Sequence, residues 1–259
     1  MKAALLAALL LAGGPALPQE NPLQPSATWE DLRQSVLGLA GDVAQDATVL
    51  DLEAPLRAYE AAIVPVRLVQ PADAPPVRAA TLVIDENPAP VAAEYGFGPA
   101  LMPLDFEMRV RVDSYSDVRV IADTGNGSRV MAGRFVKASG GCSAPAGKDM
   151  AEVEATMGQM RWRSAPENGR HVGTLMIRHP NFSGLQRDQV TLLNIPAHFI
   201  DRLEVRQGDE MLFSLEAGIS ISEDPVFRFA YAPNGQPIHV RVEDTDGNRW
   251  DQTFEAVSG

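Results

Sequence analysis

Residues 106–113 read Phe-Glu-Met-Arg-Val-Arg-Val-Asp. Apolar and charged side chains alternate along this stretch, and successive side chains of a strand point to opposite faces of a sheet. One face is therefore expected to pack on a core and the other to meet water, as in a half-buried antiparallel strand. The pattern predicts an all-β fold.

Similar short segments recur along the chain between residues that favour turns. From Ile63 onward the pattern predicts strands at residues 80–85, 106–112, 118–122, 129–136, 173–179, 200–205, 211–215, 226–231 and 238–243. The run Asp-Thr-Gly-Asn-Gly at 123–127 is typical of a hairpin turn between two of them. Short strands at this spacing favour β-sandwiches over a doubly wound sheet.

A short amphipathic helix is predicted at residues 28–38, ahead of the strands. Thr28 suits the N-cap position, and Gly38 can end the helix. Trp29, Leu32 and Val36 recur at helical spacing, so they should share the packed face.

The composition changes at Ala138. Residues 138–147 read Ala-Ser-Gly-Gly-Cys-Ser-Ala-Pro-Ala-Gly, which offers little apolar surface for a core. We expect a first sandwich domain at 28–138, an arm and linker at 139–156, and a second sandwich domain at 157–259. Residues 148–156 could form a short helix within that linker.

The first sixteen residues have the pattern of a secretory signal. Lys2 precedes an apolar run at 3–12, and Gly14 and Ala16 place small residues before a cleavage point at Leu17. No second apolar run approaches the roughly 20 residues of a membrane helix. The sequence predicts an exported protein without membrane insertion.

The charge balance limits the classes of partner. The chain has 22 basic and 34 acidic residues, a net charge of −12. This argues against nucleic-acid binding, which depends on neutralising phosphates with Lys and Arg.

Cys142 is the only cysteine of the 259 residues and lies between Gly140-Gly141 and Ser143-Ala144. Its small, flexible neighbours predict an exposed thiol on a mobile arm, with Gly140 and Gly141 supplying the flexibility. An exposed thiol has a pKa near ~8.5, so little of it is thiolate at neutral pH. That is unsuited to an enzyme's own nucleophile but acceptable for a carrier that other enzymes load and unload.

The other candidate sites are weaker. The four histidines, His171, His179, His198 and His239, are expected to be structural rather than metal ligands. Residues 244–248 read Asp-Thr-Asp-Gly-Asn and fit a hairpin turn better than a calcium loop. We expect neither a metal nor a cofactor.

Two groups of motifs resemble a known family, the SoxYZ sulfur carriers, with both subunits fused. The SoxY-like features are Ile63-Val64-Pro65-Val66, Leu82-Val83-Ile84-Asp85-Glu86-Asn87-Pro88, Gly133-Arg134-Phe135 and Gly140-Gly141-Cys142. The SoxZ-like features are Ile177-Arg178-His179-Pro180, Ser183-Gly184, Ile195-Pro196-Ala197-His198-Phe199-Ile200 and Asn248-Arg249-Trp250.

The resemblance implies two immunoglobulin-like sandwiches in a periplasmic carrier that is not an enzyme. Cys142 would hold sulfur intermediates covalently for Sox-type sulfur-oxidising enzymes or for a periplasmic quinoprotein dehydrogenase system. The sequence departs from SoxY in one respect, because SoxY carries its cysteine on a free C-terminal tail, whereas this chain continues past Cys142.

Two other hypotheses remain open. The protein could be a non-covalent binding or scaffold module for a dehydrogenase, with Cys142 incidental. It could also be a thiol enzyme, which would require a depressed pKa at Cys142.

Overall fold

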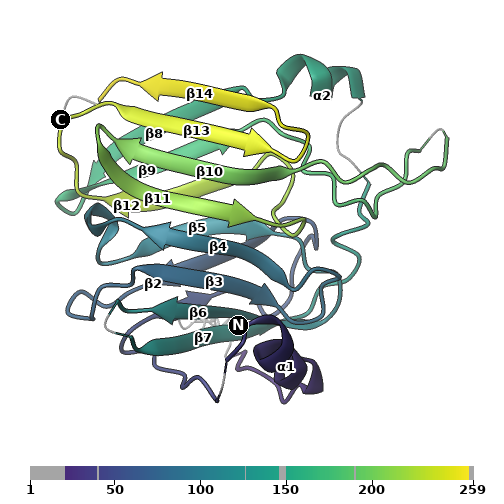
Figure 1. Ribbon diagram of the computed structural model, residues 1–259, viewed down its shortest axis with the longest axis horizontal. Helices are drawn as coiled ribbons and strands as arrows, with labels where there is room; N and C mark the ends of the chain where they lie inside the picture. The colour runs from purple at the N-terminus through teal and green to yellow at the C-terminus, as the bar shows by residue number, and fades with distance from the viewer. Residues whose placement is uncertain (1–20, 40, 126, 146–149, 190, 257–259) are drawn as a thin grey trace, which may run out of the picture.

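Two antiparallel sheets face each other across one apolar core. The computed structural model describes residues 21–39, 41–125, 127–145, 150–189 and 191–256, and within these it contains a 6-stranded and an 8-stranded sheet. The two layers are stacked in Figure 1. The all-β prediction is confirmed.

Each layer is one antiparallel sheet that contains strands from both halves of the chain. The 8-stranded sheet runs β14 (Arg249–Phe254), β13 (Ile238–Asp244), β10 (Ile200–Gln207), β11 (Glu210–Ala217), β4 (Val91–Phe97), β3 (Ala79–Ile84), β6 (Ser116–Asp123) and β7 (Arg129–Val136). The 6-stranded sheet runs β1 (Asp51–Glu53), β2 (Val64–Val69), β5 (Asp105–Val110), β12 (Val226–Tyr231), β9 (Arg170–Ile177) and β8 (Met160–Glu167).

Each sheet passes without a break from the N-terminal half of the chain to the C-terminal half. In the larger sheet β4 pairs with β11, with Phe97 opposite Phe213 and Ala93 opposite Ala217. In the smaller sheet β5 pairs with β12, with Phe106 opposite Phe229. The two halves are therefore joined by backbone hydrogen bonds in both layers, and Figure 1 shows β4 next to β11.

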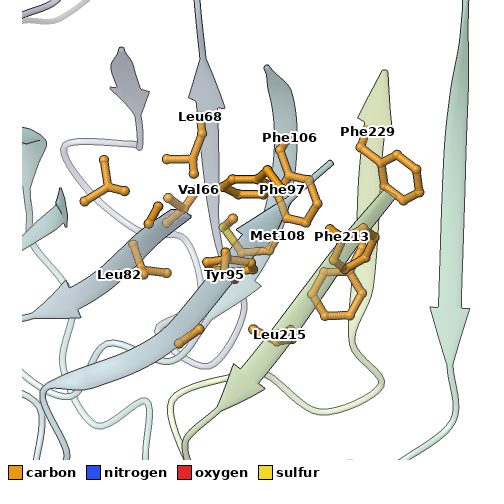
Figure 2. Packing of buried hydrophobic residues seen from close by; sticks show 14 of the residues in the cluster. Val66, Leu68, Leu82, Tyr95, Phe97, Phe106, Met108, Phe213, Leu215 and Phe229 are labelled. Atoms are coloured by element: carbon orange, nitrogen blue, oxygen red, sulfur yellow. The ribbon is translucent and has the colours of Figure 1, made fainter. Parts of the chain in front are cut away.

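The core is richest in aromatic rings where the halves meet. Phe106 is fully buried. Its ring centroid lies within 6.2 Å of those of five other aromatic residues: Tyr95, Phe97, Phe213, Phe227 and Phe229. Figure 2 shows these rings between the strands, next to aliphatic side chains such as Leu68 and Leu82. Packing as well as pairing therefore connects the two halves.

The short N-terminal helix is also confirmed. It consists of α1 (Ala27–Asp31) followed directly by η1 (Leu32–Val36), a turn of π-helix. Ser26 rather than Thr28 caps it, because the Ser26 Oγ accepts a hydrogen bond from the Trp29 N–H at 3.0 Å. Gly38 has φ of +60°, a conformation that favours glycine where the helix ends.

Arg119 fixes this helix to the outer face of the larger sheet. Its guanidinium lies 4.5 Å from the centroid of the Trp29 ring and forms buried ion pairs with Asp85 and Asp117 at 2.9 and 2.6 Å. Both faces of β6 are consequently buried, which the alternation rule does not anticipate.

Two short helices complete the described elements. The turn η2 (Pro99–Leu101) follows β4, and α2 (Met150–Thr156) forms the helix that the acidic stretch suggested. The predicted signal segment lies outside the described residues. Among the residues that are described, no helix has the length and apolar character needed to cross a membrane.

We predict that Phe106→Ala lowers the free energy of unfolding by about 3 to 5 kcal/mol, because a buried aromatic ring is lost from the junction. Urea denaturation followed by tryptophan fluorescence measures the change. The control is Tyr59→Ala, since Tyr59 is fully exposed and its loss should matter by less than ~0.5 kcal/mol. A loss below about 1 kcal/mol for Phe106→Ala would show that the junction contributes little.

Candidate functional site

Cys142 lies after β7, in a stretch of chain that runs beside the residues that follow β5. The Gly140 N–H donates to the Asp113 carbonyl at 2.7 Å, and the Gly141 N–H donates to the Val112 carbonyl at 3.2 Å. The Cys142 N–H donates to Asp113 Oδ1 at 3.1 Å. Three consecutive backbone donors are thus satisfied by one short stretch of neighbouring chain.

The two glycines make this approach possible. Gly140 has φ of +75°, which side chains other than glycine rarely adopt. A Cβ on Gly141 would lie 2.2 Å from the Ala61 carbonyl oxygen and 2.6 Å from that of Val112. Glycine is therefore required at 141 for close packing, a role that the sequence analysis did not assign.

The Cys142 side chain is buried, with 0% of its surface exposed. The prediction of an exposed thiol is therefore wrong for this structure. That prediction considered only the neighbours of Cys142 in sequence, whereas the covering groups come from residues distant in the chain. Ala138, in the stretch expected to contribute nothing to a core, is also buried in the main cluster.

The C-terminal half supplies part of this cover. The segment between β9 and β10 carries Ser183, whose Oγ donates to the Cys142 carbonyl, and Gln186, whose Nε2 donates to the Ala144 carbonyl at 2.9 Å. Gln186 Oε1 in turn accepts from the Ser183 backbone N–H at 3.1 Å, which fixes the Gln186 side chain next to Ser183. Residues 182–198 therefore hold the cysteine segment in place.

Residues 182–189 and 191–198 belong to a loop that projects from one end of the sandwich in Figure 1. Its base is closed by two hydrogen bonds between Phe182 and His198, and a further bond joins Ile195 to Gln186. Farther out, Leu192 and Leu193 are 68% and 70% exposed. The loop is therefore ordered at its base, beside Cys142.

The thiol environment opposes ionisation. Burial, together with the nearby Asp113 carboxylate, raises the pKa of Cys142 to about 11, and Arg111 acts in the opposite direction. A raised pKa keeps the thiol protonated at neutral pH. This argues against the thiol-enzyme hypothesis, which needs a stabilised thiolate.

Arg111 is buried, although the alternation of residues 106–113 placed it on the solvent-facing side. The strand pairing ends near Val110, and the next residues are covered by the segment after β11. The Arg111 N–H donates to the Ser220 carbonyl at 2.7 Å, and the Arg111 Nη1 donates to the Ile221 carbonyl at 3.0 Å. Arg109, two residues earlier, does face solvent as predicted.

A second cluster brings together His179, His198 and Asp244, which lie far apart in the sequence. Nε2 of His198 lies 2.7 Å from Asp244 Oδ2, and Nε2 of His179 lies 3.3 Å from the same oxygen. These ligating atoms all lie within 4.8 Å of one another. The sequence analysis discussed all three residues separately but did not predict that they meet.

The hydrogen bonds of this cluster indicate a structural role. Asn181 donates its N–H to His179 Nδ1 at 3.1 Å, so the proton of the neutral ring lies on Nε2, which donates to Asp244. Asp244 also accepts from the Asp246 and Asn248 backbone at 3.0 and 2.9 Å. A metal ion bound to Nε2 of His179 would require the ring proton to lie on Nδ1, where it would face the Asn181 N–H. The arrangement therefore does not favour a metal ion.

The pKa values agree with this interpretation. Burial lowers the pKa of His179, which keeps its ring neutral. Burial alone would raise the pKa of Asp244, but its hydrogen bonds, chiefly from Asn248 and His198, lower it to about 2. Residues 244–248 form the turn between β13 and β14, as the hairpin interpretation predicted.

The remaining two histidines lie elsewhere on the sheets. Nδ1 of His171 is 3.3 Å from the Ser164 hydroxyl, and Nδ1 of His239 is 2.9 Å from the Thr253 hydroxyl. Neither is in a ligating group with other described residues. The single thiol, held between the two halves, is thus the most distinctive chemical feature of the fold.

The fold and this site define a two-layer β-sandwich protein with one sequestered thiol at the junction of its halves. Residues 33–142 match the family "Sulfur oxidation protein SoxY", and residues 160–255 match "Sulphur oxidation protein SoxZ". The chain belongs to the SoxY/SoxZ sulfur-carrier family, with both domains fused in one chain. The fold is mostly β, with two antiparallel sheets and a short N-terminal helix, as predicted.

One similar solved structure is the sulfur carrier protein SoxY from Chlorobium limicola f thiosulfatophilum. It is 23% identical, with a TM-score of 0.36, and the alignment covers 42% of this chain and 93% of that one. No curated protein shows significant similarity to the chain. SoxYZ is a non-catalytic sulfur carrier complex of the periplasmic Sox system, so the family supports the prediction that the protein is not an enzyme.

We predict that the free energy of unfolding of the wild type falls relative to Cys142→Ser as the pH rises from 9 to 11. The unfolded thiol ionises near its ordinary pKa of ~8.5, whereas the folded thiol keeps its proton up to about 11, so rising pH favours the unfolded chain. The expected loss is roughly 2 kcal/mol. Urea denaturation of both proteins across this range measures it, and a constant difference would contradict the burial of the thiol.

Proposed function

We propose that the protein carries sulfur groups covalently on Cys142 and presents them to partner enzymes. The observation that supports this most directly is that the SoxY match ends at residue 142, so the only cysteine of the chain occupies the end of the matched domain. The site residues of this proposal are Cys142 for attachment, and Gly140 and Gly141 for movement of the segment that bears it.

Because the thiol is buried, attaching a sulfur group to it requires residues 140–145, the cysteine segment, to move away from their buried position. The segment is called seated when its hydrogen bonds to the rest of the protein are formed, and open when they are broken. The contacts to be broken are the hydrogen bonds to Val112, Asp113, Ser183 and Gln186 described above. Each hydrogen bond contributes a net ~0.5 to 1.5 kcal/mol. Their sum is a few kcal/mol, within the stability of a typical domain, so the segment can open without unfolding the sandwich.

The seated and open states have different roles in this proposal. In the seated state the sulfur group is shielded from solvent and from unrelated thiols. In the open state the segment, which is anchored at both ends, extends Cys142 toward a partner. Glycine permits the change of backbone angles at 140 and 141, since it has the widest choice of conformations.

The partners we propose are Sox-type sulfur-oxidising enzymes or a periplasmic quinoprotein dehydrogenase system, and the cargo is a small sulfur species. Residues 1–16 would direct export to the periplasm. The division into domains at 28–138 and 157–259, joined by residues 139–156, is also part of this proposal. The net charge of −12 continues to disfavour nucleic acid as a partner.

The burial of Cys142 also favours a second candidate, a non-covalent scaffold for a dehydrogenase in which the thiol is incidental. The two functions differ in one outcome. A client enzyme supplemented with Cys142→Ala protein keeps its full activity if the protein is a scaffold and loses it if the protein is a carrier.

We predict that tetrathionate loads the folded protein with one thiosulfonate group. The Cys142 thiolate attacks a central sulfur of tetrathionate, a new S–S bond forms, and thiosulfate leaves with the electron pair of the broken S–S bond. Intact-mass spectrometry should show one adduct on the wild type and none on Cys142→Ser. An adduct on Cys142→Ser, or no adduct on the wild type after prolonged exposure, would contradict the carrier function.

We predict that the double substitution Ser183→Ala and Gln186→Ala increases the rate of Cys142 alkylation by iodoacetamide about tenfold, because two hydrogen bonds to the segment are lost. Mass spectrometry follows the reaction in the folded protein. The matched control is Gln189→Ala in the same loop, because that amide donates to the Arg187 carbonyl within the loop. Equal rates in all three proteins would show that the loop does not retain the segment.

A further inference from the structure

Arg111 is a buried cation that directly precedes Val112 and Asp113, the residues that accept the hydrogen bonds of the Gly140, Gly141 and Cys142 N–H groups. Only 1% of its surface is exposed, and it is among the largest fully buried side chains of the described residues. Its Nη1 donates to the Ile221 carbonyl at 3.0 Å. Its Nε is buried and has no hydrogen-bond partner among the described residues. The guanidinium is therefore only partly satisfied.

A buried guanidinium is costly unless an anion accompanies it. The acidic groups in electrostatic contact with Arg111 are the Cys142 thiol and the half-buried Glu223. The carboxylate of Asp113 lies next to Cys142, because its Oδ1 accepts a hydrogen bond from the Cys142 N–H. Burial lowers the pKa of Arg111, while the thiol stays neutral at neutral pH, so the empty carrier gives Arg111 no anion at position 142.

We propose that Arg111 binds the anionic sulfur group that Cys142 carries, a persulfide or a thiosulfonate, when the segment is seated. This inference rests on the proposed carrier function and assigns a binding residue for its cargo. Arg111 holds the charge of the cargo and takes no part in forming or breaking its bonds.

The chemistry of the cargo fits this role. A persulfide is a stronger acid than the parent thiol, and a thiosulfonate carries a permanent negative charge. Guanidinium groups donate several hydrogen bonds in one plane, and hydrogen bonds between charged partners are the stronger ones. The loaded segment should therefore be held more firmly than the empty one. A neutral adduct on Cys142 gains nothing from Arg111.

The test compares a charged adduct with a neutral one. Tetrathionate gives the thiosulfonate, as above. Methyl methanethiosulfonate gives a neutral methyl disulfide, because the thiolate attacks its methylthio sulfur and methanesulfinate leaves with the electron pair. Both adducts are prepared on the wild type, on Arg111→Met and on Arg111→Lys. Intact mass then follows the release of each adduct by dithiothreitol from the folded proteins.

We expect the wild type to release the thiosulfonate about tenfold more slowly than Arg111→Met, since a hydrogen-bonded ion pair is lost. Arg111→Lys should lie between them. The methyl disulfide should leave the wild type and Arg111→Met at equal rates, which separates the effect of charge from a general loosening of the segment.

Equal release of the thiosulfonate from the wild type and Arg111→Met would overturn the inference while leaving the carrier function intact. Failure of the wild type to form any adduct would instead overturn the carrier function itself, and the inference with it. If Arg111→Met does not fold, the wild type alone decides. Its melting temperature should be higher with the thiosulfonate than with the methyl disulfide, and the reverse order would overturn the inference.

Discussion

The pairing of β4 with β11 and of β5 with β12 is the constraint on which the other features depend. It joins the SoxY and SoxZ domains through both sheets, so their relative position is set by backbone hydrogen bonds and by aromatic packing around Phe106. This fixed geometry brings residues 182–198 of the SoxZ domain over the cysteine of the SoxY domain. The fusion of the two domains thus places the cover in the same chain as the thiol.

Both backbone and side-chain groups hold the segment that carries Cys142. Gly141 fits against Ala61 and Val112 because it has no Cβ. The side chains of Ser183 and Gln186 donate hydrogen bonds to backbone carbonyls of the segment, so these bonds do not involve the group that Cys142 carries. The contacts that hold the segment are therefore weak individually, whereas those that hold the sandwich are extensive. This difference allows local opening in an otherwise stable fold.

Much of the fold could be predicted from the sequence, because a two-residue alternation is a local property of a strand. It located β5, β6, β7, β10 and β13, together with the hairpin turns between them. It failed where burial depends on distant residues: the N-terminal helix covers the outer face of β6, whose other face packs in the main core, and the segment around Ser220 covers Arg111. Cys142 was singled out by its uniqueness, but its burial and the hydrogen bonds of its backbone to Asp113 and Ser183 have no local signal.

The claim that Cys142 becomes accessible by local opening is tested most directly by the urea dependence of its alkylation in the folded protein. If the segment opens locally, the rate is measurable without urea and changes little with urea concentration until the sandwich begins to unfold, because little surface is exposed. If Cys142 reacts only through global unfolding, the rate rises steeply from the lowest urea concentrations with the slope of the unfolding transition. That second result would contradict the account.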